Sequence, residues 1–145
     1  MFEKMMLATD GSDNAQDALR YATELAQLAG TREVLVVHIC PGCTADIDVK
    51  DTNREMAEDI VEAAASPFRE IGIETRTRVE IDYPPEAIGS AIVDVELREK
   101  PDLLVLGSRG LSEFKGLLLG SVSSKVVQKA HCPVLVIKHE QAESR

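Results

Sequence analysis

The sequence predicts a single α/β domain built on a doubly wound, five-stranded parallel sheet with helices on both faces. Short apolar runs alternate with longer segments whose apolar residues recur every three or four positions, as strands alternate with amphipathic helices. Most of the runs are apolar at nearly every position, which is typical of parallel strands covered on both faces. The chain has 145 residues and no internal repeat, linker or break in composition, so we expect one domain.

Five segments are expected to form the strands. Four are short and apolar, whereas the third alternates apolar and charged residues, which predicts a half-exposed strand at a sheet edge. In chain order, the predicted strands span residues 4–8, 33–39, 73–81, 102–107 and 133–137.

Helices are expected between the strands. The first begins at about Asn14; Asp13 can cap it, with Gln16 three residues on, and Gly30 can end it,. The others are expected over residues 52–71, from Pro84-Pro85 to about residue 99, and from residue 121 to about 130.

The second helix carries a proline in its predicted span. Its apolar stripe contains Met56, Ile60, Ala63, Ala64 and Phe68. Pro67 interrupts this pattern, so Ser66 could cap a separate short helix that has Pro67 at its first position,.

Composition excludes several classes of protein. The net charge of −9, the absence of Trp and an aromatic content of 3% argue against a nucleic-acid-binding surface. No run of about 18 apolar residues is present, so we expect no membrane span. The N-terminus lacks the pattern of a signal peptide, which predicts a cytoplasmic protein, and the three Cys residues make a disulfide framework improbable there.

Two predicted strands end in residues suited to bind a ligand, and in an open parallel sheet ligands bind beyond such ends, where the winding reverses. The first strand leads to Asp10, which could accept hydrogen bonds from a sugar or base. The fourth ends at Gly107, where the backbone can approach a ligand closely. Gly120 then opens a helix whose N–H groups and serine hydroxyls form an anion cradle, and Arg109 and Lys115 add positive charge.

The same residues have a simpler interpretation. Glycines after a strand often form only a turn, and Gly-Ser before a helix is ordinary capping. A P-loop ending in Gly-Lys-Ser/Thr and a GxGxxG fingerprint are both absent from the sequence,. From spacing alone, a phosphate site and a plain strand-to-helix turn both remain open.

A longer resemblance favours the nucleotide site. Residues 102–138, DLLVLGSRGLSEFKGLLLGSVSSKVVQKAHCPVLVIK, resemble the C-terminal half of the universal stress protein (UspA domain) family, and LATDGSDNAQDALRYATELAQ resembles its start. ATP-binding members carry G-x2-G-x9-G-[ST], which reads here as Gly107, Gly110, Gly120 and Ser121. The departures, at residues 40–51 and 82–85, do not touch this motif. We therefore expect such a domain over residues 1–138 and a frayed polar tail over residues 139–145.

The resemblance implies the strand order 3-2-1-4-5, with ATP bound across strands one and four. It implies that Asp10 holds the adenosine part and that Ala8, Thr9 and Val37 line the base. The residues that it places around the ribose and phosphates are Gly107, Arg109, Gly110, Gly120, Ser121, Val122 and Ser123. A divalent ion, Mg²⁺ or Mn²⁺, is expected on the phosphates, with no site made of protein side chains alone.

Cys40 and Cys43 form a Cys-x-x-Cys, which could hold zinc or cycle as a dithiol,. Zinc needs two more ligands, and His131 and Cys132 precede the last strand, at the opposite end of the predicted sheet. A long polar loop follows the pair, rather than a helix. We therefore expect free thiols in a reducing cytosol, and we expect His38 to be a structural residue of a buried strand.

Two classes of function compete. The favoured one is a nucleotide-dependent regulatory or stress-response switch, in which bound ATP changes a surface that a protein partner of unknown identity reads. The alternative is a slow ATPase or phosphoryl-transfer enzyme, which needs a positioned water or nucleophile at the γ-phosphate. No catalytic residue is assigned, because the one evident base, Asp10, is taken for the adenosine end. We expect weak or partner-dependent hydrolysis at most.

The last predicted strand carries no charged residue from Pro133 to Ile137. As the final strand of the implied order, it would leave an apolar sheet edge uncovered. We therefore expect a homodimer in which this strand pairs with its own copy about a two-fold axis, as the resemblance also implies. The alternative is that the C-terminal tail or a helix covers the edge.

Overall fold

The computed structural model describes residues 1–43, 52–81, 83–108 and 119–139. The elements alternate along the chain, as the sequence predicts. They are β1 (Lys4–Ala8), α1 (Asp13–Ala29), β2 (Glu33–Ile39), α2 (Thr52–Glu70), β3 (Glu74–Glu80), a 3-10 turn (Pro85–Ala87), α3 (Ile88–Glu99), β4 (Leu103–Gly107), α4 (Ser121–Lys129) and β5 (Val134–Ile137). Among these helices, none is both long and apolar enough to cross a membrane.

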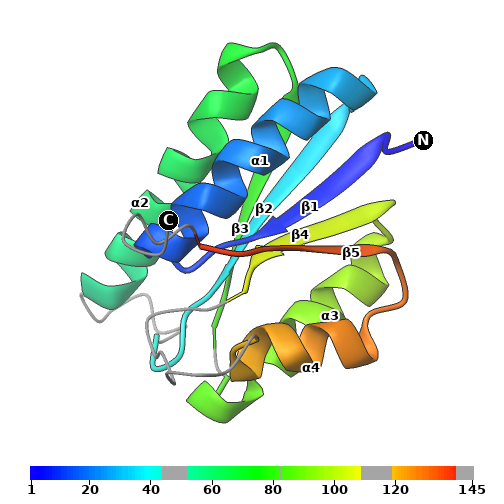
Figure 1. Ribbon diagram of the computed structural model, residues 1–145. Coiled ribbons are helices and arrows are strands. Elements are labelled where there is room, and N and C mark those ends of the chain that lie inside the picture. The colour runs from blue at the N-terminus through cyan, green and yellow to red at the C-terminus, as the bar shows by residue number, and fades with distance from the viewer. Residues whose placement is uncertain (44–51, 82, 109–118, 140–145) are drawn as a thin grey trace, which may run out of the picture.

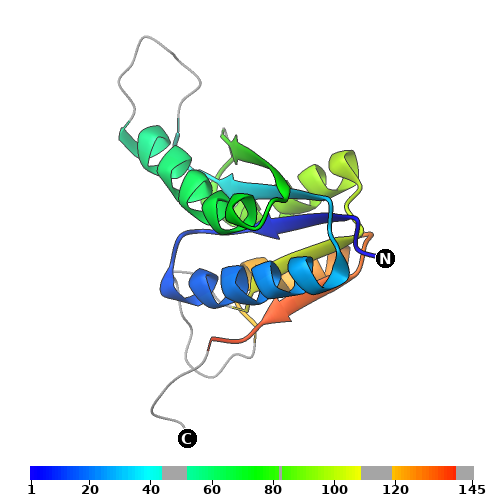
Figure 2. The same cartoon turned by 90° about the horizontal axis from the view of Figure 1, so that it is seen from above.

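The five strands form one parallel sheet in the order β3-β2-β1-β4-β5, which confirms the predicted fold class and strand order. Figure 2 shows that the strands point the same way, with the N-terminus at the end where they begin. The chain winds outward through β2 and β3 and then returns beside β1 as β4. The winding therefore reverses between β1 and β4, where a parallel sheet opens a crevice at its carboxyl edge.

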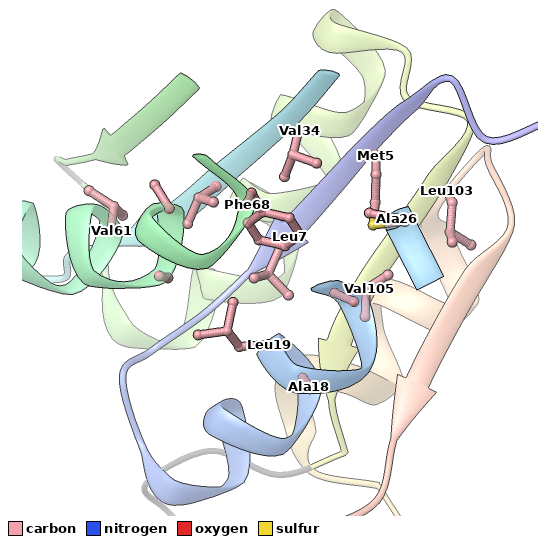
Figure 3. Packing of buried hydrophobic residues seen from close by; sticks show 14 residues of the cluster. Met5, Leu7, Ala18, Leu19, Ala26, Val34, Val61, Phe68, Leu103 and Val105 are labelled. Carbon is pink, nitrogen blue, oxygen red and sulfur yellow. The ribbon is translucent and has the colours of Figure 1, made fainter. Parts of the chain in front are cut away.

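Two apolar layers hold the helices to the sheet. Alternate residues of a strand face opposite sides, so Met5 and Leu7 of β1 pack with α1 and α2, whereas Met6 and Ala8 pack with α3 and α4. Figure 1 shows these helix pairs on opposite faces of the sheet. In Figure 3, Phe68 of α2 reaches toward Leu7 at the centre of the first layer.

The ends of α1 differ in part from the prediction. Ser12, not Asp13, is the N-cap, since its side chain accepts a hydrogen bond from the backbone N–H of Ala15. Asp13 instead occupies the first helical position, where a carboxylate favours the positive end of the helix dipole. Gly30 ends the helix, as predicted, with a left-handed φ of 68°.

Helix α2 runs without a break from Thr52 to Glu70, so the prediction of a second helix at Ser66-Pro67 is wrong. Pro67 removes one backbone hydrogen bond, but buried neighbours on either side of it hold the helix against the sheet. The predicted stripe is also shifted, because Met56 is 59% exposed. The buried residues are Ala57, Val61, Ala64, Ala65 and Phe68.

Candidate functional site

The ends of β1 and β2 bring the three predicted base-lining residues together. Ala8 pairs with Val37 in the sheet register, and the N–H of Thr9 donates to the carbonyl oxygen of Val37 at 2.9 Å. Ala8 and Val37 face the layer of α3 and α4, and Val122 of α4 packs against that same cluster. Residues from both halves of the fold therefore pack together on this side of the sheet.

A tight turn carries Asp10 from β1 into α1. The N–H of Gly11 donates to the hydroxyl of Thr9 at 3.2 Å, and the N–H of Ser12 donates to Oδ1 of Asp10 at 2.9 Å. Gly11 has a φ of +75°, and a Cβ there would lie 3.0 Å from the side chain of Ile60, so glycine suits both its conformation and its space. The turn orients the Asp10 carboxylate just beyond the carboxyl end of β1.

Ser108 ties the end of β4 to two other elements. Its N–H donates to the carbonyl oxygen of Ile137 at 2.8 Å, and its carbonyl oxygen accepts from the N–H of Gly120 at 2.7 Å. The hydroxyl of Ser123 donates to the same carbonyl oxygen at 2.6 Å. Ser108 was not among the predicted site residues, because a serine after a buried strand carries no distinctive sequence signal.

The start of α4 has backbone N–H groups that no capping side chain of Gly120 occupies. Gly120 is its N-cap and makes no side-chain capping bond, so the N–H groups of the first turn are not capped by that residue. Such groups, with the positive end of the helix, form a general anion site. The structure thus places Gly107 at the last position of β4. It places four further residues at or in the first turn of α4: Gly120, Ser121, Val122 and Ser123. Arg109, Gly110 and Lys115 lie outside the described residues.

His38 is a second link between the strands at this edge. Its Nδ1 lies 2.8 Å from the carbonyl oxygen of Thr9. Because a carbonyl oxygen only accepts, Nδ1 carries the proton in this contact. The side chain is half-buried and bonded to the backbone, in agreement with the structural role expected for it.

The structure corrects the expectation of free thiols at Cys40 and Cys43, because these two residues form a disulfide. Their Cα atoms are 5.6 Å apart, a separation usual for bonded cysteines. Gly42, with a φ of +78°, closes the turn between them. Cys132 is free. Among the described residues, no group of three or more His, Cys, Asp or Glu side chains could hold a metal ion.

Glu96 forms a buried anchor at the opposite end of the sheet. It is 2% exposed and accepts backbone hydrogen bonds from His131 at 3.2 Å and Cys132 at 3.1 Å, just before β5. Burial, followed by the nearby Glu96 carboxylate, raises the pKa of the Cys132 thiol to about 11. This cysteine is therefore a poor nucleophile near neutral pH.

A groove of about 310 Å³ lies between α2 and β3, away from the crevice. Its lining residues are Arg54, Glu58, Val61, Glu62, Thr77, Val79 and Ile81. None of them is a predicted nucleotide-binding residue, and the groove contributes nothing to that site.

The comparisons with known proteins agree on one family. Residues 1–138 match the model of the Universal stress protein family. A universal stress protein from Thermus aquaticus is 34% identical over 141 residues, which cover 95% of this chain and 100% of that protein.

Solved structures of this family share the fold. A universal stress protein from Archaeoglobus fulgidus has a TM-score of 0.74 and 32% identity, and the match covers 95% of this chain and 100% of that one. A structure of the universal stress protein from Archaeoglobus fulgidus in complex with dAMP has a TM-score of 0.71 and 30% identity, with the same coverage of 95% and 100%.

Proposed function

This chain belongs to the universal stress protein family, and from that premise we propose that it binds ATP in the crevice between β1 and β4. The observation that carries the proposal is the sheet order, in which β1, followed by Asp10, lies beside β4, whose end is bonded to the glycine-capped start of α4 through Ser108 and Gly120. One end of this arrangement accepts hydrogen bonds and the other donates them, which matches the hydroxyl groups and the phosphates of a nucleotide. The dAMP complex of a relative supports an adenine nucleotide as the ligand.

At the adenosine end, we assign Asp10 to the sugar and Ala8, Thr9 and Val37 to the base. Thr9 and Val37 bond to each other, so their part of the wall is rigid before any ligand arrives. The apolar side chains of Ala8 and Val37 belong to the layer of α3 and α4, so we assign the flat face of the base to the α3 and α4 side of the sheet.

At the phosphate end, we assign the backbone N–H groups of Ser121 and Val122, with Gly107, Gly120 and Ser123 shaping the cradle. Arg109 and Gly110 complete the proposed set from outside the described residues. Mg²⁺ or Mn²⁺ would be held chiefly by the phosphate oxygens, with the hydroxyl of Ser121 within the same cradle. The metal would neutralise phosphate charge, while the residues of the chain bind and orient the ligand.

A regulatory switch suits this site better than an enzyme. Ser108 bonds both to Gly120, at the start of α4, and to Ile137, at the end of β5. A phosphate that shifts the start of α4 would therefore act on a residue bonded to the edge strand, where a protein partner could detect the change. The alternative, a slow ATPase, needs a base beside the phosphates, and Asp10 lies at the adenosine end. We propose the cytoplasm as the location.

The experiment is calorimetry of ATP binding to Gly120→Val. Gly120 has a φ of −71°, which any residue adopts, so the new side chain should act on the approach of phosphate rather than on the backbone. A steric cost of about 1–3 kcal/mol should weaken binding by about five- to 150-fold. Val127→Ala, at an exposed position of the same helix, is the matched control.

ATP affinity that is equal in Gly120→Val and the wild type would contradict the phosphate site. A second measurement separates the switch from the enzyme. Nucleotide retained by the purified protein is identified by mass spectrometry before and after incubation with Mg²⁺. A switch keeps its ATP over hours, whereas stoichiometric conversion to ADP within minutes would favour the ATPase.

A further inference from the structure

Cys40 and Cys43 lie at this edge of the sheet, and nucleotide binding does not use them. They follow β2 directly, and Cys40 lies three positions beyond Val37. The disulfide between them closes a turn of only two residues. Gly42, at the tip of that turn, is exposed, and Pro41 is half-buried, so the turn faces solvent although the two cysteines are only 5% and 4% exposed.

The backbone holds the two cysteines together independently of the bond between their sulfur atoms. The N–H of Cys40 donates to the carbonyl oxygen of Glu80 at 2.8 Å, which continues the pairing of β2 with β3. The N–H of Cys43 donates back to the carbonyl oxygen of Cys40 at 3.4 Å. With these contacts and the left-handed Gly42 in place, two reduced thiols would remain close enough to close again without rearrangement.

The surroundings suit both oxidation states. The pair packs against Ala57 of α2, with Val79 and Ile81 beside it. An apolar contact accepts a thiol or a disulfide equally well, because both behave as small hydrophobic groups. The Sγ of Cys40 also lies 3.9 Å from the carbonyl oxygen of Asn53, which can accept a thiol proton when the pair is reduced.

A purely structural bond would gain little at this position. The stabilisation that a disulfide gives by restricting the unfolded chain grows with the length of the loop it closes, and this loop is among the shortest. In a reducing compartment, disulfides that do form are usually transient and take part in redox chemistry.

We propose that Cys40 and Cys43 are a redox-active pair that cycles between dithiol and disulfide by exchange with small thiols and disulfides. In the oxidising direction, one protein thiolate attacks a small disulfide and releases half of it as a thiol. The second cysteine then attacks the mixed disulfide and releases the other half. The protein loses two electrons and two protons, and the small disulfide gains them; reduction by two small thiols is the reverse.

The test equilibrates the full chain, without nucleotide, in glutathione buffers from fully reduced to fully oxidised. Samples are quenched with acid, unfolded and alkylated, and intact mass counts the alkylated thiols. The expected count is three in the reducing buffers and one in the oxidising buffers, with two thiols lost together and Cys132 retained. Cys132→Ser is the matched control and should pass from two labels to none.

Cys43→Ser tests the assignment to the pair. It should form no internal disulfide, and Cys40 should instead carry glutathione in the oxidising buffers. Three outcomes for the wild type would overturn the proposal: three labels in every buffer, one label even in the most reducing buffer, or a glutathione adduct that accumulates in place of the internal bond. Because ATP takes no part, failure of the nucleotide proposal would leave this result unaffected.

Discussion

At the residue scale, Asp10 has two roles: one within the turn after β1, and one proposed in binding the nucleotide. Its Oδ1 accepts the N–H of Ser12, which orients the carboxylate, and we assign the group as a whole to the sugar of the nucleotide. A hydrogen bond to a charged group contributes roughly 1.5–3 kcal/mol. The contribution of Asp10 to binding affinity should therefore be the same for ligands with and without phosphates.

Asp10→Ala should weaken the binding of ATP and of adenosine by similar factors, about ten- to hundredfold. Gly120→Val should weaken ATP binding alone. Competition assays with both ligands would measure the four affinities. Asp10→Asn is the matched control, because its amide oxygen can still accept the Ser12 N–H. Wild-type adenosine affinity in Asp10→Ala would show that Asp10 does not hold the sugar.

Local sequence rules predict the role of an individual residue only where a single interaction decides it. Gly30 was predicted to end α1 because few other residues adopt its left-handed conformation at low cost. Ser12 and Asp13 are both good caps, and the choice between them depends on the turn that Asp10 and Gly11 impose. Ser108 acts through its backbone, which no residue type reveals.

At the scale of elements, α3 and α4 approach one another closely at Gly89. A Cβ built on Gly89 would lie 2.7 Å from the Cβ of Lys125 and 3.3 Å from the carbonyl oxygen of Val122. Both distances are shorter than ordinary contacts, and neither atom is the free end of a flexible chain. The glycine, which weakens a helix by roughly 1 kcal/mol relative to alanine, is thus required by packing.

Gly89→Ala should destabilise the protein, although alanine is the better helix former. Overpacking of this kind costs typically about 1–3 kcal/mol, which exceeds the gain in propensity. Urea unfolding would measure the difference in the free energy of unfolding. Ser90→Ala, at an exposed position of α3, should be neutral or slightly stabilising, and a stabilised Gly89→Ala would contradict the close packing.

Glu99 joins α3 to β1 and β3 through ion pairs, and one of its partners continues the network to β2. Its carboxylate contacts Lys4 of β1 at 3.0 Å, Arg76 of β3 at 2.8 Å and Arg78 of β3 at 3.3 Å, and Arg76 also contacts Glu33 of β2 at 2.8 Å. The side chain of Glu99 is 15% exposed. Hydrogen bonds from Arg76, and then from Lys4, lower the pKa of Glu99 from 4.5 to about 2.

Because the folded-state pKa of Glu99 is depressed, its contribution to stability is complete above about pH 4.5 and is lost as the pH falls toward 2,. Glu99→Gln should lower the free energy of unfolding by roughly 1–3 kcal/mol at pH 7. The difference from the wild type should shrink to near zero at the acid end of that range. Urea unfolding at several pH values measures it, with the exposed Glu86→Gln as control. A difference independent of pH would contradict the ion-pair origin.

The sequence predicts the elements themselves well, because periodicity reports which residues are buried. It misplaces the stripe of α2, since Met56 is apolar yet exposed, while small alanines such as Ala57 pack against the sheet. It also gives too much weight to Pro67, whose local cost the packing of Phe68 outweighs. Tertiary contacts decide both the buried face of α2 and its continuity through Pro67, and the sequence of the helix alone does not show these contacts.

At the scale of the whole molecule, alternation of strands and helices predicts a parallel sheet, but it does not fix which strands are neighbours. The order β3-β2-β1-β4-β5 followed from the family resemblance. That order makes β1 and β4 neighbours, so that Asp10 follows one of two adjacent strands and Gly120 is bonded to Ser108 at the end of the other, although 109 residues lie between Asp10 and Gly120 in the sequence. It also leaves β5 at one edge, joined to the site through the bond between Ser108 and Ile137.

We expect the protein to form a homodimer through β5, and the two edges of the sheet show why. The edge at β3 is covered by charge, with Arg76 and Arg78 in ion pairs, whereas β5 is VLVI and each of its residues remains half-buried in the single chain. Antiparallel pairing of two β5 strands about a two-fold axis would satisfy the backbone groups of the β5 edge in both copies and would give a closed assembly.

Light scattering should therefore give about twice the chain mass of 15.8 kDa. Val136→Lys puts a charge in the middle of the paired strand and should shift the protein to monomer or aggregate. Thr75→Lys places the same charge on β3, at the other edge, and should leave the dimer intact, so it separates an interface effect from a general effect of a lysine on an edge strand. A wild-type monomer at tens of micromolar would mean that the tail or a helix covers β5, and the interface would then be abandoned.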